Sequence, residues 1–93
     1  MLKITIHEDS QPARIRIEGK LKGVWVKELE EAWRAVQRNH RRSLLDLSEV
    51  SFIDTAGCEL LCLMYRNGTE LLADQPFTRY LVDQIKAKMP RNS

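Results

Sequence analysis

Residues 44–61 of this 93-residue chain read LLDLSEVSFIDTAGCELL, and they carry its clearest structural signal. The first four, residues 44–47, form a short and nearly continuous apolar run, which is typical of a central strand covered on both faces. The mixed residues 48–54 predict a loop with apolar side chains turned inward. Thr55 then begins a helix, which the pair Asn67-Gly68 is well suited to end.

Upstream of this stretch, two segments alternate between apolar and polar residues. Residues 3–7 and 13–18 each place isoleucines on one face and charged or hydroxyl side chains on the other. Such alternation indicates a strand that is buried on one face only. The polar, proline-containing residues 8–12 between them favour a turn, so the two strands are expected to form an antiparallel hairpin.

The remaining segments show helical spacing. Residues 24–39 carry an apolar stripe made by Trp25, Leu29, Ala32, Trp33 and Val36. A brief strand is expected over residues 69–73, and Pro76 opens a third helix. On that helix we expect one shared face, made by Phe77, Tyr80, Leu81, Gln84 and Ile85. Residues 86–93 are basic, contain a proline and are expected to form a frayed tail.

This order of elements predicts an α/β fold in one domain over residues 1–93. The sheet is expected to be mixed, with about four strands: an initial antiparallel hairpin and then parallel pairs. The helices are expected to pack mainly on one side of it. A chain of this length leaves no room for a second core.

The composition indicates an ordinary globular protein, with 43% hydrophobic and 30% charged residues. No apolar run approaches the ~20 residues that a bilayer span needs, and the N-terminus lacks the apolar block of a signal peptide. Cys58 and Cys62 do not form a disulfide framework and suit a reducing compartment. We therefore expect a cytoplasmic protein that is not inserted into a membrane.

The segment around Asp54-Thr55-Ala56-Gly57 resembles the central motif of STAS domains (sulphate transporter and anti-sigma factor antagonist). In that family, an apolar strand ending in D-L leads through a short loop to D-[ST]-x-G at the start of a helix. Residues 15–21, IRIEGKL, are similar to the family's second strand, and residues 3–85 follow the family order. The tetrapeptide alone is a weak signal, and its position after an apolar strand makes it specific.

The resemblance implies a bacterial regulator without catalytic residues, cofactor or metal, whose partner is an anti-sigma factor kinase. Thr55 corresponds to the hydroxyl residue that such kinases phosphorylate, and Asp54 to the acidic residue beside it. A phosphate adds about −1.5 to −2 charges, which would release a docked partner by repulsion. We expect the partner-binding residues to be Asp54, Thr55, Ala56, Gly57, Cys58 and Leu61.

Two alternatives to a phosphorylated docking site remain open for this segment. Asp54 or Thr55 could serve only as a helix N-cap, with Gly57 present for close packing. The phosphorylated antagonists usually carry serine and a second hydroxyl, whereas this chain has Thr55 and Ala56. D-T-x-G also occurs in the STAS subunits of lipid-transporting ABC systems. There the domain docks on the ATPase, and Thr55 would be an interface hydroxyl that is never phosphorylated.

Other candidate sites are weaker. Cys58 and Cys62 share a helix face, but His7 and His40 are too distant to complete a metal site, so small apolar packing residues are the better interpretation. Asp46 and Asp54 lack a nucleophile–base pair or a phosphate-binding glycine loop, so we expect no enzyme activity. The basic residues 34–42 suggest nucleic-acid binding but lack interleaved aromatic residues, so a solvated helix end is favoured.

Overall fold

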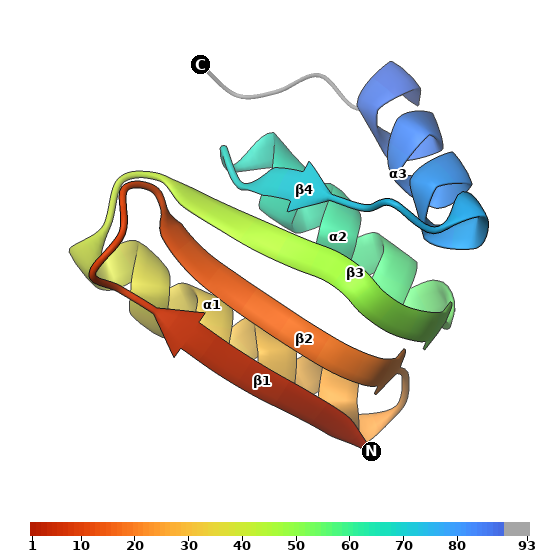
Figure 1. Ribbon diagram of the computed structural model, residues 1–93, viewed down its shortest axis with the longest axis horizontal. Coiled ribbons are helices and arrows are strands. Elements are labelled where there is room, and N and C mark those ends of the chain that lie inside the picture. Colours follow the sequence, from red (N-terminus) through yellow and green to blue (C-terminus); the bar gives the residue numbers. More distant parts are fainter. Residues whose placement is uncertain (89–93) are drawn as a thin grey trace.

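The computed structural model describes residues 1–88, and Figure 1 shows a sheet with its helices behind it. In chain order the elements are β1 (Leu2–His7), β2 (Ala13–Leu21), α1 (Val24–Asn39), β3 (Ser43–Ile53), α2 (Thr55–Arg66), β4 (Glu70–Leu72) and α3 (Pro76–Lys88). The predicted first helix has these bounds, and the other elements except β3 lie within a few residues of their predicted positions.

The four strands form one sheet in the order β1-β2-β3-β4. β1 pairs with β2 in antiparallel orientation, whereas β2 with β3 and β3 with β4 are parallel. Figure 1 shows α1 and α2 covering the same face, with α3 beyond β4. The predicted fold class is confirmed. Because β2 and β3 are parallel, their carboxyl ends lie at the same edge, where α1 and α2 begin.

β3 is much longer than the sequence pattern indicated. Residues 48–53 were expected to form a loop, but they continue the strand. The register against β2 shifts twice, so β3 contains one extra residue after Asp46 and another after Val50. Each bulge interrupts the two-residue alternation. The inward side chains therefore fall at unequal spacing, and the sequence resembles a loop.

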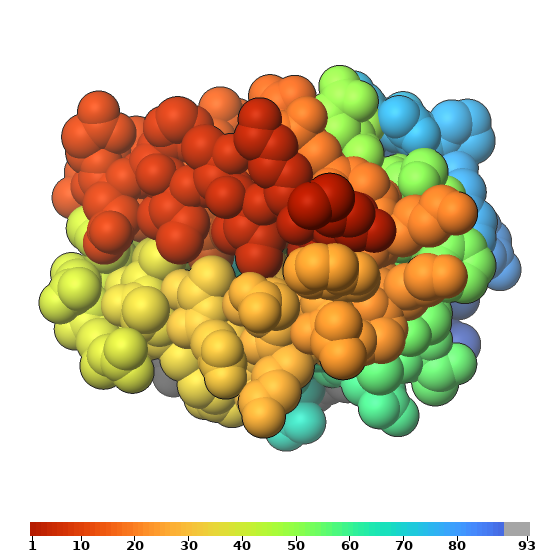
Figure 2. All heavy atoms as spheres, turned by 90° about the horizontal axis from the view of Figure 1, so that it is seen from below, coloured from red at the N-terminus to blue at the C-terminus, as the bar shows by residue number. Residues whose placement is uncertain are grey.

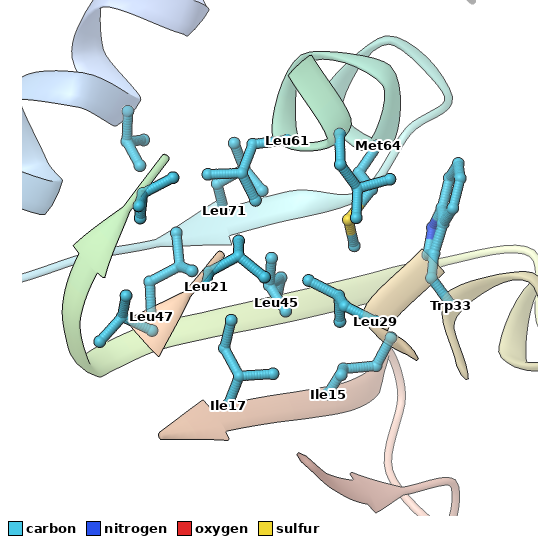
Figure 3. Packing of buried hydrophobic residues seen from close by; sticks show 14 of the residues in the cluster. Ile15, Ile17, Leu21, Leu29, Trp33, Leu45, Leu47, Leu61, Met64 and Leu71 are labelled. Carbon is cyan, nitrogen blue, oxygen red and sulfur yellow. The ribbon is translucent and has the colours of Figure 1, made fainter. Parts of the chain in front are cut away.

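A single hydrophobic core fills the space between the sheet and the helices (Figure 3). Ile15 and Ile17 of β2 and Leu45 and Leu47 of β3 are fully buried. Leu61 on α2 packs in the same cluster. The two central strands thus supply the floor of the core, as their apolar runs predicted.

Trp33 is the largest fully buried side chain and anchors α1 to the sheet. Its indole N–H donates a hydrogen bond to the Thr69 hydroxyl, with 2.9 Å between the heavy atoms. The same Thr69 oxygen lies 2.9 Å from the hydroxyl of Ser43. A buried polar group must find a partner to avoid a desolvation cost. This chain of bonds joins α1, the start of β3 and the residue before β4.

The third helix buries only part of the face we predicted. Thr78, Val82 and Ile85 point into the protein, whereas Phe77 and Tyr80 are 52% and 65% exposed. The sequence offered apolar residues on two faces, and packing selected the one that includes Val82. The helix also continues to Lys88, past the start of the predicted tail. The rest of that tail lies outside the described residues.

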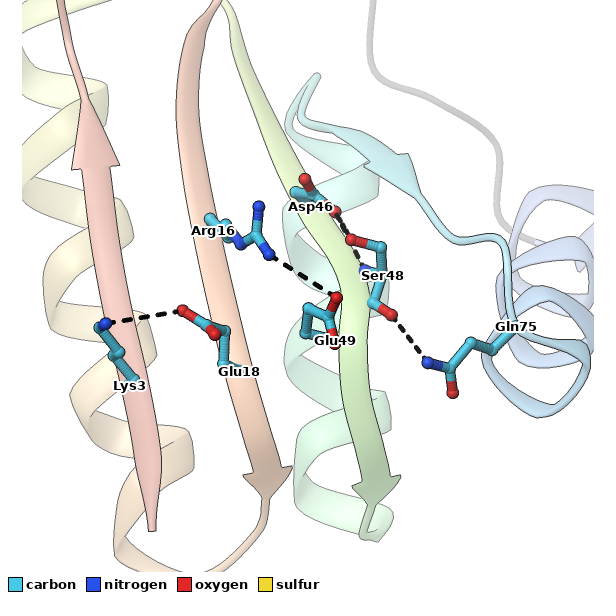
Figure 4. A network of polar contacts seen from close by, with 7 residues as sticks. All are labelled: Lys3, Arg16, Glu18, Asp46, Ser48, Glu49 and Gln75. Atoms are coloured by element: carbon cyan, nitrogen blue, oxygen red, sulfur yellow. Dashed lines mark hydrogen bonds and ion pairs between the residues drawn. The ribbon is translucent and has the colours of Figure 1, made fainter.

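The other face of the sheet carries mostly polar and charged side chains (Figure 4). Lys3 lies 4.0 Å from Glu18, and Arg16 lies 3.7 Å from Glu49. The Gln75 side chain donates to the Ser48 carbonyl over 2.9 Å, which joins the segment before α3 to β3. Exposed ion pairs of this kind contribute little stability. They leave a solvated surface opposite the helices.

Replacing Trp33 tests this packing. Trp33→Ala should lower the free energy of unfolding by ~3–5 kcal/mol, because it leaves a cavity and removes the bond to Thr69. The control is Trp25→Ala on the same helix, where the side chain is only half-buried and the loss should be clearly smaller. Urea denaturation measures both. Equal losses for the two variants would contradict the packing described here.

Candidate functional site

Asp54 lies between the end of β3 and the beginning of α2, and it is the N-cap of that helix. One carboxylate oxygen, Oδ1, accepts a hydrogen bond from the Gly57 backbone N–H over 2.7 Å. A capping oxygen of this kind satisfies one of the N–H groups that the first helical turn leaves without partners. The predicted N-cap is therefore Asp54, not Thr55.

The second carboxylate oxygen of Asp54 binds a different helix. Oδ2 accepts a hydrogen bond from the backbone N–H of Gly23 over 3.0 Å. Gly23 is the N-cap of α1 and has a φ of 57°, a conformation that glycine adopts at little cost. The backbone N–H of Asp54 also donates to the Leu21 carbonyl over 3.1 Å. One aspartate thus joins the starts of α1 and α2 to the end of β2.

These bonds affect the ionisation of Asp54. The N–H groups of Gly23 and Gly57, helped by the charge of Lys22, hold the pKa of its carboxyl below the ordinary value of 3.8. A carboxylate that accepts two backbone bonds is stabilised in its charged form. Asp54 therefore stays ionised at neutral pH.

Gly57 lies where the start of α2 presses against β2. A Cβ atom added at this position would lie 2.9 Å from Cγ2 of Ile53 and 3.0 Å from the Leu21 carbonyl oxygen. Both distances are too short for carbon, and the Leu21 carbonyl is already held by the Asp54 N–H. The glycine of the tetrapeptide is therefore required by packing.

Thr55 and Ala56 are the two residues of the tetrapeptide that remain exposed. Within residues 1–88, the Thr55 hydroxyl forms no hydrogen bond. Two apolar side chains lie near this point. Val24, 73% exposed, follows Gly23, and Phe52, 44% exposed, precedes Asp54 by two residues. We call these four residues, Val24, Phe52, Thr55 and Ala56, the α2 corner. The end of β3 and the starts of α1 and α2 lie toward the lower right of Figure 1.

Comparison with known families identifies this arrangement. Residues 4–73 match the family model described as "Mlab, STAS domain". The chain belongs to the STAS domain family. The Asp54–Gly57 tetrapeptide that suggested the family is thus part of a true STAS fold. No curated protein matches the sequence.

Solved structures agree on the STAS fold. An anti-sigma factor antagonist from Mycobacterium paratuberculosis is similar with a TM-score of 0.80 and 22% identity, over 99% of this chain and 86% of that one. The antagonist SpoIIAA in its unphosphorylated form has a TM-score of 0.69 and 20% identity, over 87% of this chain and 82% of that one. An uncharacterised protein from Shewanella loihica with a SpoIIAA-like fold has a TM-score of 0.64 and 11% identity, over 98% of this chain and 81% of that one.

Not every residue expected at the STAS partner surface is accessible. Leu61 is fully buried in the core and cannot contact a partner. The expectation was wrong because this residue lies on the inner side of α2. Gly57 is also buried, and both oxygens of Asp54 are engaged within the fold. Thr55 and Ala56 keep free surface, to which the structure adds Val24 and Phe52.

The sequence pattern did not single out these two apolar residues. Val24 immediately precedes the apolar stripe of α1, and Phe52 lies within residues 48–54, for which the sequence pattern predicts a loop. The pairing of Phe52 with Lys20 places it on the open face of the sheet, while its neighbour Ile53 points into the core. The sequence signal for this surface was the position of the apolar residue Phe52 two residues before the D-T-A-G segment.

Cys58 and Cys62 line an apolar groove between α2 and α3, with Tyr80, Leu81, Gln84, Ile85 and Lys88. Both thiols are half-buried and free. Burial, followed by the nearby Cys62, Asp54 and Glu59, raises the pKa of the Cys58 thiol, so it stays protonated at neutral pH. Of the expected partner-binding residues, Cys58 therefore faces α3 more than the α2 corner.

Asp46 and Asp54 do not form a carboxylate pair. The Asp46 Oδ1 atom accepts bonds from the hydroxyl and the backbone N–H of Ser48, over 2.7 and 3.0 Å. Burial alone would raise the pKa of Asp46, but the bonds from Ser48 and the charges of Arg14 and Arg16 lower it overall. Its role is local, within β3.

Neither a metal-binding cluster nor a membrane-spanning helix occurs within residues 1–88. Across residues 1–88, no three His, Cys, Asp or Glu side chains come together as a metal site. No helix among these residues has the length and apolar character to cross a bilayer.

Gly57→Ala tests the packing at the start of α2. Helix propensity alone would make this change stabilising by ~0.5–1 kcal/mol. The contacts with Ile53 and Leu21 should reverse the sign and cost about 1–3 kcal/mol. The control is Ala56→Gly at the exposed neighbouring position. It should lower the free energy of unfolding only by the difference in helix propensity between alanine and glycine, ~0.5–1 kcal/mol. A more stable Gly57→Ala protein in thermal unfolding would show that the close contact is unimportant.

A pH comparison tests the two hydrogen bonds that the Asp54 carboxylate accepts. A carboxylate whose pKa is lowered on folding contributes stability above its ordinary pKa of 3.8 and loses it as the pH falls through the folded value. Asp54→Asn should therefore be less stable than the wild type at pH 7. The gap should close as the pH falls through the lowered pKa of the folded protein. The shift of Asp46 is common to both proteins and cancels. A gap of constant size in urea unfolding would refute the assignment.

Proposed function

We propose that this STAS domain is a non-enzymatic protein-interaction module that docks on its partner through the α2 corner. The observation that carries the proposal is that only two of the four residues Asp54-Thr55-Ala56-Gly57 are needed for the fold. Asp54 and Gly57 serve the fold, whereas Thr55 and Ala56 are exposed at a position held from both sides. A rigid exposed surface costs little entropy on binding.

The chemistry of the α2 corner suits a protein partner. Val24 and Phe52 offer apolar surface, and the Thr55 hydroxyl offers one donor and acceptor. Apolar side chains surrounded by polar ones are typical of interface centres. None of the corner's four residues lines any of the three pockets described within residues 1–88.

The first candidate partner is a serine/threonine kinase of the anti-sigma type, with Thr55 as phosphoacceptor. Two antagonists among the similar structures motivate it. A phosphate on Thr55 would lie beside Asp54, which remains charged because its pKa is lowered. It would also add about −1.5 to −2 charges to the α2 corner. Partner release would then follow from repulsion and from the cost of desolvating the phosphate.

The second candidate partner is the ATPase of a lipid-transporting ABC system. Two features favour it: Ala56 stands where the phosphorylated antagonists carry a second hydroxyl, and Thr55 belongs to the D-T-x-G form seen in those transporter subunits. In this role the Thr55 hydroxyl donates or accepts an interface hydrogen bond. Both candidates place the protein in the bacterial cytoplasm, with no cofactor.

Substitutions at Thr55 test the docking surface. Thr55→Glu should keep the fold, because a carboxylate is tolerated at a helix start. It should weaken partner binding on the order of tenfold or more, because it places an uncompensated charge in the contact. The control is Thr5→Glu, which adds the same charge on the open face of the sheet. Binding to the kinase and the ATPase encoded nearest to this gene is measured by calorimetry.

Thr55→Ala separates the two partners. In a phosphoswitch this variant binds the kinase but gains no phosphate mass on incubation with ATP, unlike the wild type. In a transporter subunit it binds the ATPase more weakly, and no phosphate appears on either protein. If Thr55→Glu binds every partner as well as the wild type does, the α2 corner is not the docking surface.

A further inference from the structure

The end of the protein opposite the α2 corner contains a pocket that the proposed function does not use. It has a volume of about 480 Å³. Its walls are Gln11, Asn39, His40, Arg41 and Arg42. At the left of Figure 1, the turn between β1 and β2 lies beside the connection from α1 to β3, and these two segments form it. We call these five residues the arginine pocket.

Two contacts hold the segments together. The His40 Nε2 atom lies 2.8 Å from Glu8 Oε2, and the Ala13 N–H donates to the Arg42 carbonyl over 3.2 Å. Figure 2 shows the atoms of the first turn and of the α1–β3 connection in contact on this side of the molecule. The walls are therefore linked before any ligand binds, which lowers the entropy cost of binding.

The chemistry of the walls selects an anion. Two guanidinium groups and two side-chain amides supply N–H donors, and neither a carboxylate nor an aliphatic side chain lines the pocket. Glu8, the nearest acid in these contacts, is engaged by His40. Among residues 1–88, neither Arg41 nor Arg42 forms an ion pair. Guanidinium groups bind the oxygens of phosphoryl groups in pairs.

These arginines are not explained by the helix beside them. A cation near a helix C-terminus favours the dipole, and Arg38 in the last turn of α1 supplies one. Arg41 and Arg42 lie beyond the helix and are exposed. Arg34, which was grouped with them in the sequence, pairs instead with Glu30 over 3.0 Å and lies over the Trp33 ring. Within the basic run, Arg34 thus has a partner on its own helix, whereas Arg41 and Arg42 line the pocket.

We propose that the arginine pocket binds a phosphoryl group, carried either by a small phosphate ester or by a lipid headgroup. A nucleic acid fits less well, because no aromatic side chain lines the pocket to stack a base. The site shares no residue with the α2 corner and does not depend on the proposed docking function.

The experiment uses the full chain and two probes: glycerol 3-phosphate by calorimetry, and phosphatidylcholine vesicles with or without phosphatidic acid by co-sedimentation. The double variant Arg41→Gln/Arg42→Gln should bind the preferred probe on the order of tenfold more weakly, because two charge-assisted bonds are lost. The matched control Arg79→Gln/Lys86→Gln removes the same charge from exposed positions on α3 and should bind as the wild type does.

The outcomes are distinct. Binding of glycerol 3-phosphate indicates a small ester, and binding only to vesicles that contain phosphatidic acid indicates a headgroup, so both support the site. Three results overturn it: no binding of either probe, equal losses in the two double variants, or displacement of the probe by duplex DNA at lower concentration. Partner binding through Thr55, measured in parallel, should not change in either double variant.

Discussion

The Asp54 carboxylate is the interaction on which the rest of the site depends. Each of its oxygens accepts an N–H from the start of a different helix, and its own N–H binds the end of β2. Three elements are thereby fixed at the carboxyl edge of the sheet. A longer or uncharged side chain could not satisfy both helix starts at these distances. Thr55 is held in position by its neighbour and needs no bond of its own.

The parallel pairing of β2 and β3 explains why the two candidate sites are far apart. The carboxyl ends of both strands lead into helix starts, which are partly positive and attract Asp54. At the other end, the chain leaves α1 and enters β3 past Arg41 and Arg42. The molecule therefore carries an apolar and hydroxyl-bearing surface at one end and a cationic pocket at the other. A single domain of this size can contact a protein partner while its second end stays free.

Features set by local spacing were predictable from the sequence. The bounds of α1 follow from its apolar stripe, and the hairpin of β1 and β2 follows from two alternating runs. The length of β3 was not predictable, because two bulges change which residues point inward. The exposure of Phe77 and the burial of Leu61 depend on how each helix is rotated against the sheet. At the site, the tetrapeptide was recognised, but the bond between Asp54 and Gly23, 31 residues apart, is a product of folding alone.

The two tryptophans of this protein occupy very different surroundings. Trp33 is enclosed in the core and donates to Thr69, whereas Trp25 is half-buried in the first turn of α1, next to Val24. Indole emission shifts with the polarity around the ring. The protein therefore contains two intrinsic optical reporters, one sensitive to the integrity of the core and one close to the α2 corner. Partner contact at that corner would alter the emission of Trp25 and leave the emission of Trp33 unchanged. Docking and unfolding would therefore give different fluorescence changes without any added label.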